Sequence, residues 1–201
     1  MNEKFYLGTY TKRVSKGVYS VTLNKETDQL ESLTLEAAID NPTYLSYSKS
    51  DQLLFAVGKG EEHCGISASN ALTSPVEPLA SYDDQKAVPC YIRYNEKTGD
   101  VLTANYHGGF VELYHYDKEE GAFTFVDKKV HSGSSVHANQ TSPHVHYTDY
   151  TPDEKWVVVC DLGIDTVFTY RRTETGLEEV AQYKTKAGSG PRHLAFHPTL
   201  P

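Results

Sequence analysis

The fold is decided by a short motif that occurs four times, as NPTYLSY at 41–47, VPCYIRY at 88–94, SPHVHY at 142–147 and GPRHLAF at 190–196. Each copy begins with a small or turn-forming residue and a proline, and then continues as an extended run. The four prolines lie 47, 54 and 48 residues apart. A pattern that returns every 45–50 residues or so is typical of propeller blades, each of which is one small sheet.

Strand-like segments fill the intervals between these motifs. An apolar run begins about a dozen residues after each of the first three prolines, at 53–57, 100–104 and 156–160. Other runs rich in aromatic and β-branched residues lie at 5–7, 17–23, 109–116 and 166–170. No segment shows a helical stripe, and an open β-sandwich would give strands without a constant phase. The sequence therefore predicts an all-β fold, a β-propeller of four-stranded blades.

The number of repeats sets the expected domain organisation. We expect one β-propeller domain over residues 1–201, with an incomplete first blade and full repeats that open near 42, 89 and 143. The first strand of another blade is expected from 191, over 192–196. Such a chain would be the front portion of a longer protein. Expressed alone, we expect it to be poorly soluble or self-associated and nearly inactive, because its sheet edges would be open.

Composition excludes several classes of function. Lys and Arg number 19 against 27 Asp and Glu, and the net charge of −8 argues against nucleic-acid and membrane partners. The longest apolar runs are far shorter than a membrane span, and we expect no secretion signal. Three cysteines without C-x-x-C spacing predict no disulfide framework and favour the cytoplasm.

Several motifs together resemble the seven-bladed propeller lactonases of the bacterial 6-phosphogluconolactonase type. The matching stretches are FYLGTYT at 5–11 with GVY at 17–19, ANYHGG at 104–109, PHVH at 143–146 with PD at 152–153 and DLGID at 161–165, and GPRHLAFHP at 190–198. The resemblance runs along the whole chain, and it implies a seven-bladed fold of which about four blades lie here. Muconate-lactonizing propeller enzymes are similar and use a comparable inner site.

Because the first strand of a blade lines the central channel, the repeat openings are the candidate site. Aligning the last two repeats on their closing prolines equates His146 with Arg192, whereas aligning them on their opening prolines equates His144 with Arg192. A histidine can take a proton from water, and an arginine can hold an oxyanion, carboxylate or phosphate. We predict His146 as the general base and Arg192 as the anion ligand. Because the two alignments differ, the choice between His144 and His146 as the base stays open.

Three further residues are predicted to support substrate binding: His144, His193 and Asn105. In the muconate enzymes a histidine and an arginine match His146 and Arg192, and the resemblance implies a glutamate and a second arginine from later blades. Asn105 lies in a Gly-Gly turn, which gives it an alternative role in that turn. The Gly188–Gly190 segment could cradle a phosphate or simply connect two blades. Asp161 and Asp165 flank a short turn and are expected to accept backbone hydrogen bonds there.

Histidines cluster between 131 and 146, but no carboxylate or cysteine stands at ligand spacing, so we predict no metal and no other cofactor. His131 and His137 are interpreted as structural. The predicted function is hydrolysis of a sugar lactone in the pentose phosphate pathway. The favoured substrate is 6-phosphoglucono-1,5-lactone. A non-catalytic binding scaffold and a muconate-type lactonizing enzyme are the alternatives. The sequence leaves the oligomeric state open.

Overall fold

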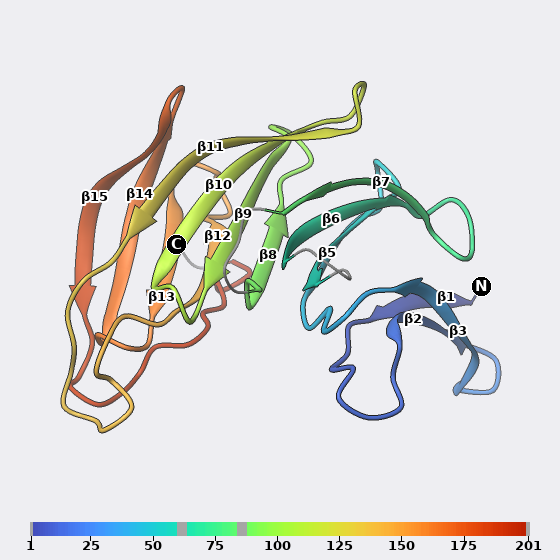
Figure 1. Ribbon diagram of the computed structural model, residues 1–201, viewed down its shortest axis with the longest axis horizontal. Coiled ribbons are helices and arrows are strands. Elements are labelled where there is room, and N and C mark those ends of the chain that lie inside the picture. Colours follow the sequence, from blue (N-terminus) through green and yellow to red (C-terminus); the bar gives the residue numbers. More distant parts are fainter. Residues whose placement is uncertain (1, 60–63, 84–87, 200–201) are drawn as a thin grey trace. The chain divides into compact units, whose positions relative to one another are not determined.

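The computed structural model describes residues 2–59, 64–83 and 88–199. These residues form antiparallel sheets joined by turns and loops, and they contain no helix (Figure 1). The chain packs as two compact units, residues 1–88 with 118–122 and residues 89–117 with 123–201. The predicted all-β class is confirmed.

The first unit holds two sheets in which each strand pairs with the next along the chain. One sheet contains β1 (Glu3–Leu7), β2 (Gly17–Asn24) and β3 (Gln29–Ala38). The other contains β4 (Leu45–Ser48), β5 (Leu53–Lys59), β6 (Cys64–Asn70) and β7 (Glu77–Tyr82). Neighbouring strands in both sheets are antiparallel.

The second unit repeats the four-stranded meander twice. One sheet contains β8 (Tyr91–Tyr94), β9 (Asp100–Asn105), β10 (Phe110–Asp117) and β11 (Ala122–Val130). The other contains β12 (Val145–Tyr150), β13 (Val157–Asp161), β14 (Thr166–Thr173) and β15 (Gly176–Lys184). The four-stranded sheets predicted to follow the prolines at 42, 89 and 143 are confirmed.

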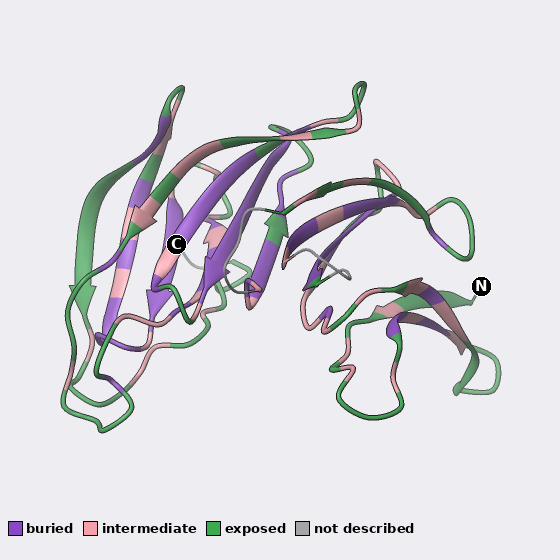
Figure 2. Cartoon of the chain, viewed as in Figure 1, coloured by how far each residue is buried: buried purple, intermediate pink, exposed green. Residues whose placement is uncertain are grey.

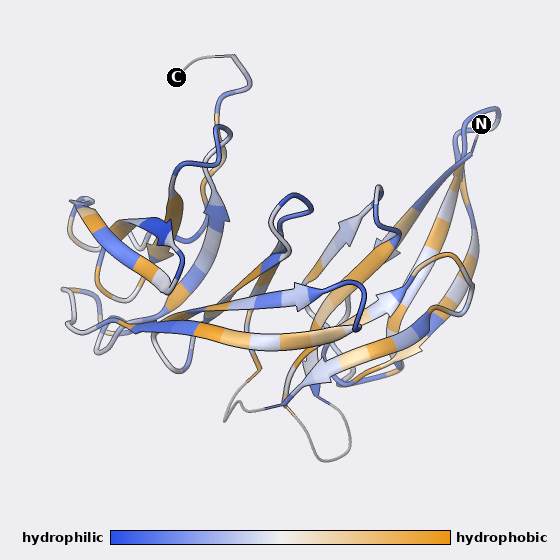
Figure 3. Ribbon diagram, turned by 90° about the horizontal axis from the view of Figure 1, so that it is seen from above, coloured by the Kyte–Doolittle hydropathy of each residue, from blue (hydrophilic) through white to orange (hydrophobic). Residues whose placement is uncertain are grey.

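Burial falls from the second strand of each four-stranded sheet to the last. Every residue of β9 and β13 is buried, as is all of β5 except Lys59, whereas β7, β11 and β15 are largely exposed (Figure 2). A strand covered on both faces needs no polar alternation, which is why the runs at 53–57 and 156–160 are apolar throughout. Hydrophobic bands follow the strands, and the connecting turns are mostly hydrophilic (Figure 3).

The strand expected over 192–196 does not form. Residues 191–199 take no strand conformation, although they repeat the proline opening that precedes β4, β8 and β12. In those three sheets the opening strand pairs with the strand that follows it. No described segment pairs with 191–199, and a strand needs the hydrogen bonds of a neighbour to persist.

Candidate functional site

The candidate site is built around the start of β12. His144 precedes the strand, and Val145 opens it, opposite Asp161 on β13. The next pair joins Tyr147 to Cys160, so the register shifts between Val145 and Tyr147 and leaves His146 as the additional residue of a β-bulge. A bulge bends its strand and redirects the side chain of the extra residue. Val145 is fully buried and anchors the bulge beside the half-buried His146.

The structure brings the two predicted catalytic residues together. The Nε–H group of Arg192 donates a hydrogen bond of 3.0 Å to Nε2 of His146. A ring nitrogen that accepts a hydrogen bond carries no proton, so the proton of the neutral imidazole lies on Nδ1. That Nδ1 atom is buried and has no hydrogen-bond partner among the described residues. The contact therefore fixes the tautomer of His146.

The surroundings of His146 keep it neutral near pH 7. Burial, the charge of Arg192 and the neighbouring His193 together lower the pKa of His146 to about 4. The ring of His193 meets the ring of His146 edge-on, with centroids 5.0 Å apart. Burial and Arg192 lower the pKa of His193 as well. The structure thus places Arg192, His146 and His193 in one cluster, as the predicted site requires.

Tyr106 lies between the two histidines of the Pro-His-x-His segment. Its ring stacks on His144 at 4.2 Å with an interplanar angle of 5°, and it meets His146 edge-on at 6.1 Å. His144 is held further by Nδ1, which lies 3.0 Å from the carbonyl oxygen of Tyr106. A main-chain carbonyl can only accept, so Nδ1 of His144 is the donor. Tyr106 is a site residue that the sequence reasoning did not single out.

Cys90, which occupies the Arg192 position of an earlier repeat, lies beneath His146. Its thiol lies 3.4 Å from the carbonyl oxygen of Ala104 and 3.7 Å from that of His146, and it donates toward both. Burial raises the pKa of Cys90 to about 11. The thiol is therefore a protonated donor that packs under the bulge, and it is not poised as a nucleophile.

Asn105, predicted to bind substrate, is fully buried at the end of β9. Its Oδ1 accepts a hydrogen bond of 2.8 Å from the amide of Gly108, and its carbonyl oxygen accepts the amide of Gly109. Gly109 has a φ of +64°, and a Cβ there would collide with Pro143. The hydrogen bond to Gly108 thus places the Asn105 side chain in the turn, and its role in substrate binding stays a prediction.

Asp161 links the site to the interior of the second unit. Its Oδ1 accepts the amides of His144 at 2.7 Å and Gly163 at 3.0 Å. Its Oδ2 lies 2.7 Å from Nδ1 of His131, whose Nε2 is 2.9 Å from the hydroxyl of Tyr170. The backbone role expected for Asp161 is confirmed. The bridge through His131 was missed, because residues 30 or more positions apart give no local signal.

The glycines at 188 and 190 do form a cradle of amides, but an internal carboxylate fills it. Asp165 accepts the amide of Gly188 at 2.6 Å and that of Gly190 at 2.7 Å. Burial acts to raise the pKa of Asp165, but the hydrogen bonds from Ser135, Gly190 and Gly188 outweigh it and hold the pKa well below its usual range. The phosphate-cradle interpretation is therefore wrong, and the segment anchors the chain just before Arg192.

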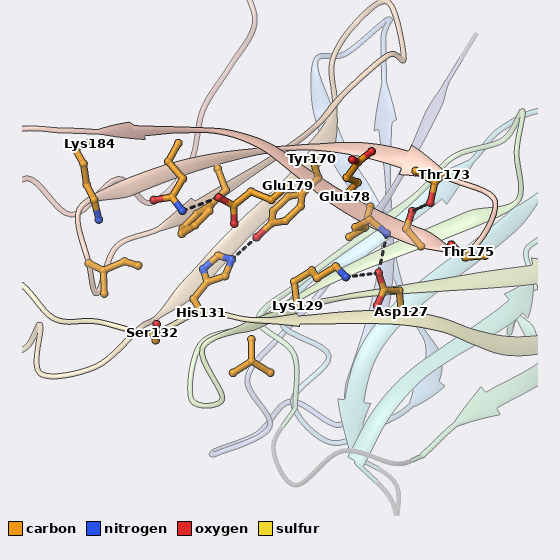
Figure 4. Close-up of a pocket in the computed structure, with 16 residues that line it drawn as sticks. Asp127, Lys129, His131, Ser132, Tyr170, Thr173, Thr175, Glu178, Glu179 and Lys184 are labelled. Atoms are coloured by element: carbon orange, nitrogen blue, oxygen red, sulfur yellow. Dashed lines mark hydrogen bonds and ion pairs between the residues drawn. The ribbon is translucent and has the colours of Figure 1, made fainter.

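A pocket of about 800 Å³ lies between β11 and the strands β14 and β15 (Figure 4). His131 and Tyr170, which are joined by a hydrogen bond, line this pocket. Asp127 on β11 forms an ion pair with Lys129 on the same strand and accepts a hydrogen bond from the amide of Leu177 on β15. None of its lining residues belongs to the predicted site. Among residues 2–59, 64–83 and 88–199, no three His, Cys, Asp or Glu side chains gather as a metal site.

The family description "Lactonase, 7-bladed beta-propeller" matches residues 4–201. The chain belongs to this family of propeller lactonases. The resemblance to the propeller lactonases and the predicted propeller of four-stranded blades are thereby confirmed. No helix among the described residues is long and apolar enough to cross a membrane.

Individual relatives of the lactonase family agree with this assignment. The chain is 35% identical over 199 residues to the 6-phosphogluconolactonase of Bacillus subtilis, covering 96% of this chain and 56% of that protein. A crystal structure of a protein from Lactobacillus plantarum has a TM-score of 0.92 at 37% identity, over 98% of this chain and 57% of that one. The periplasmic gluconolactonase of Pseudomonas aeruginosa has a TM-score of 0.89 at 26% identity, over 98% and 59%. The chain thus spans somewhat more than half the length of these relatives.

Proposed function

We propose that this chain carries the His–Arg part of the active site of a lactonase that opens a sugar lactone. The proposed substrate is 6-phosphoglucono-1,5-lactone, and the product is 6-phosphogluconate. The observation that carries the proposal is the 3.0 Å contact between Arg192 and His146 in a chain of the propeller lactonase family. The relative from Bacillus subtilis supports the choice of substrate through its name.

The proposed chemistry has two steps, and both use the same imidazole. Nε2 of His146 removes a proton from water as the water oxygen bonds to the lactone carbonyl carbon, which leaves a negative charge on the carbonyl oxygen. The carbonyl then re-forms, the bond from that carbon to the ring oxygen breaks, and the ring oxygen takes the proton from the imidazolium. The product is a hydroxy acid, which ionises to its carboxylate.

Arg192 is proposed to bind the anionic parts of this reaction. Its guanidinium carries several donors that match either the oxyanion of the tetrahedral intermediate or a phosphate group. The chain as a whole has a charge of −8 and repels anions at long range, so recognition of an anionic lactone must rest on local groups such as this one. His144, His193 and Asn105 remain proposed substrate-binding residues.

We also propose a cytoplasmic location and a role in the pentose phosphate pathway. The free cysteines at 64, 90 and 160 suit a reducing compartment. The relative from Pseudomonas aeruginosa is named periplasmic, and the periplasm is therefore the competing location. Fractionation of the native cells tests the point, because a protein recovered with the periplasmic fraction would contradict it.

Lactone hydrolysis by the protein expressed from the complete reading frame tests the proposed function. The rate with 6-phosphoglucono-1,5-lactone is compared with spontaneous hydrolysis and with glucono-1,5-lactone. We expect acceleration with the phosphorylated lactone, and a loss of about a hundredfold or more in His146→Gln, the usual size of a general-base effect. His115→Gln, an exposed histidine on β10, is the matched control and should keep full activity.

Three outcomes would contradict the proposal. A rate no higher than the spontaneous one would leave the non-catalytic scaffold as the better interpretation. Turnover of an unsaturated dicarboxylate in place of the lactone would indicate the muconate-type activity. Full activity in His146→Gln would retain the lactonase function but remove His146 as its base.

A further inference from the structure

The hydrogen bond that joins the two candidate catalytic residues also blocks one of them. Nε2 of His146 accepts from Arg192, so its single lone pair cannot at the same time accept a proton from water. The other ring nitrogen, Nδ1, holds the proton of the neutral ring and is buried without a partner among the described residues. In this arrangement, His146 has no nitrogen free to act as a base.

Arg192 is well placed to leave. Its one side-chain hydrogen bond among the described residues is the contact with His146. Within the described part of the chain, its guanidinium is paired with no carboxylate, although the chain carries 27 acidic residues. The neutral ring offers the guanidinium one acceptor without charge, whereas an oxyanion offers the opposite charge and a bidentate contact. An oxyanion therefore competes well for this arginine.

We propose that Arg192 caps the lone pair of His146 until an oxyanion, a phosphate or a carboxylate on the ligand, draws the guanidinium away and frees Nε2. The inference rests on the proposed function and deepens it, because it makes the base available only when an anionic group is bound. A lactone that carries such a group would activate its own hydrolysis. A neutral lactone would meet a capped base and would react slowly.

The charges around His146 give this exchange a measurable signature. The groups that face the ring are Arg192 and His193 from the 191–199 segment and Tyr106 from the turn after β9. Cys90, before β8, contacts the main-chain carbonyl of His146. Arg192 is the permanently charged member of this set, and it contributes to the low pKa of His146. Neutralising it with a bound anion should therefore raise that pKa, which removal of the arginine should also do.

Histidine proton NMR on the protein from the complete reading frame tests the exchange without any assay of activity. Sulfate is the phosphate-like probe and acetate the carboxylate probe, each against chloride at equal ionic strength, between about pH 5 and about pH 7.5. His146→Gln identifies the signal of His146. In chloride we expect no titration of His146 in this window. With the bound anion we expect its pKa to rise by at least about one unit, a tenfold change in the equilibrium, so that protonation of His146 becomes visible at the acid end of this window.

Variants separate the capping contact from general charge effects. Arg192→Gln should raise the pKa of His146 in chloride and abolish the response to either anion. Arg171→Gln removes an exposed arginine that pairs with Glu178 on the same unit. This variant should leave the pKa of His146 in chloride and its response to the anions unchanged. A response to sulfate alone indicates a phosphate ligand, and a response to acetate alone indicates a carboxylate. A His146 signal that responds to neither anion, or to Arg192→Gln no more than to Arg171→Gln, would overturn the proposal.

A kinetic measurement gives an independent readout and distinguishes the two proposals. Sulfate should accelerate hydrolysis of the neutral glucono-1,5-lactone several-fold in the native protein and not in Arg192→Gln. If the protein hydrolyses no lactone but His146 still responds to anions, the proposed function fails and the capping inference stands. If lactones are hydrolysed and His146 does not respond, the capping inference fails alone.

Discussion

The chemistry proposed here depends on one property of His146, its protonation near neutral pH. Burial and the charge of Arg192 lower its pKa to about 4, so the free protein holds the neutral base over the physiological range. The rate constant kcat/KM reports the free enzyme, and we expect its acid limb near pH 4, below the ordinary histidine value of about 6.5. The profile of kcat reports the enzyme–substrate complex, and its acid limb should lie at higher pH because the bound anion neutralises Arg192. If the acid limbs of kcat/KM and kcat coincide near about pH 6.5, the low pKa of His146 is contradicted.

The same shift predicts how stability depends on pH. The pKa of His146 is lower in the folded state than in the unfolded chain, so unfolding takes up a proton between about pH 6.5 and about pH 4. Stability is therefore lost as the pH falls through this window, and the full penalty is present below about pH 4. His146→Gln should remove roughly 1–3 kcal/mol of this loss. Urea unfolding at several pH values measures the free energy of unfolding of both proteins. If this free energy depends on pH in the same way in the native protein and in His146→Gln, the prediction is refuted.

At the scale of the elements, the repeated proline motif and the apolar runs were sufficient to locate the first two strands of each four-stranded sheet and, in the second unit, the third strand as well. The continuous run at 156–160 becomes β13 at Val157–Asp161, because burial on both faces selects apolar residues throughout. The bulge at His146 was not predictable, since it depends on the register against Asp161. The strand at 192–196 was wrong because a favourable sequence still needs a partner strand.

The bridge from Asp161 through His131 is the element-scale feature that sequence could not supply. Asn places its amide nitrogen near the position of Nδ1 of a histidine, and Gln places it near Nε2. His131→Asn should therefore keep the 2.7 Å contact with Asp161, whereas His131→Gln should lose it. We expect His131→Gln to be less stable than His131→Asn by about 1–2 kcal/mol, because Gln keeps the neutral contact with Tyr170 and loses the stronger, charge-assisted contact with Asp161. Equal free energies of unfolding in urea would show that Asp161 does not depend on this contact.

At the scale of the whole molecule, the open edge of β1 governs how the 201-residue chain behaves alone. Among the described strands β1 pairs with β2 alone, and its residues Phe5 and Leu7 are 44% and 40% exposed. Such an edge offers unpaired backbone groups to another chain. We expect residues 1–201 to self-associate with rising concentration, and Phe5→Lys to increase the monomer fraction. Light scattering after size-exclusion chromatography measures both, and a chain that is monomeric at every concentration would contradict the expectation.

The most direct test of the His–Arg site is a double-mutant cycle on lactone hydrolysis. Rates with 6-phosphoglucono-1,5-lactone are measured for the complete protein, His146→Gln, Arg192→Gln and the double variant, with spontaneous hydrolysis subtracted. Because Arg192 and His146 contact each other and act on one reaction, we expect the double variant to be no slower than the slower single variant. Losses that multiply, or single variants that keep full activity, would show that the two residues do not form one catalytic unit.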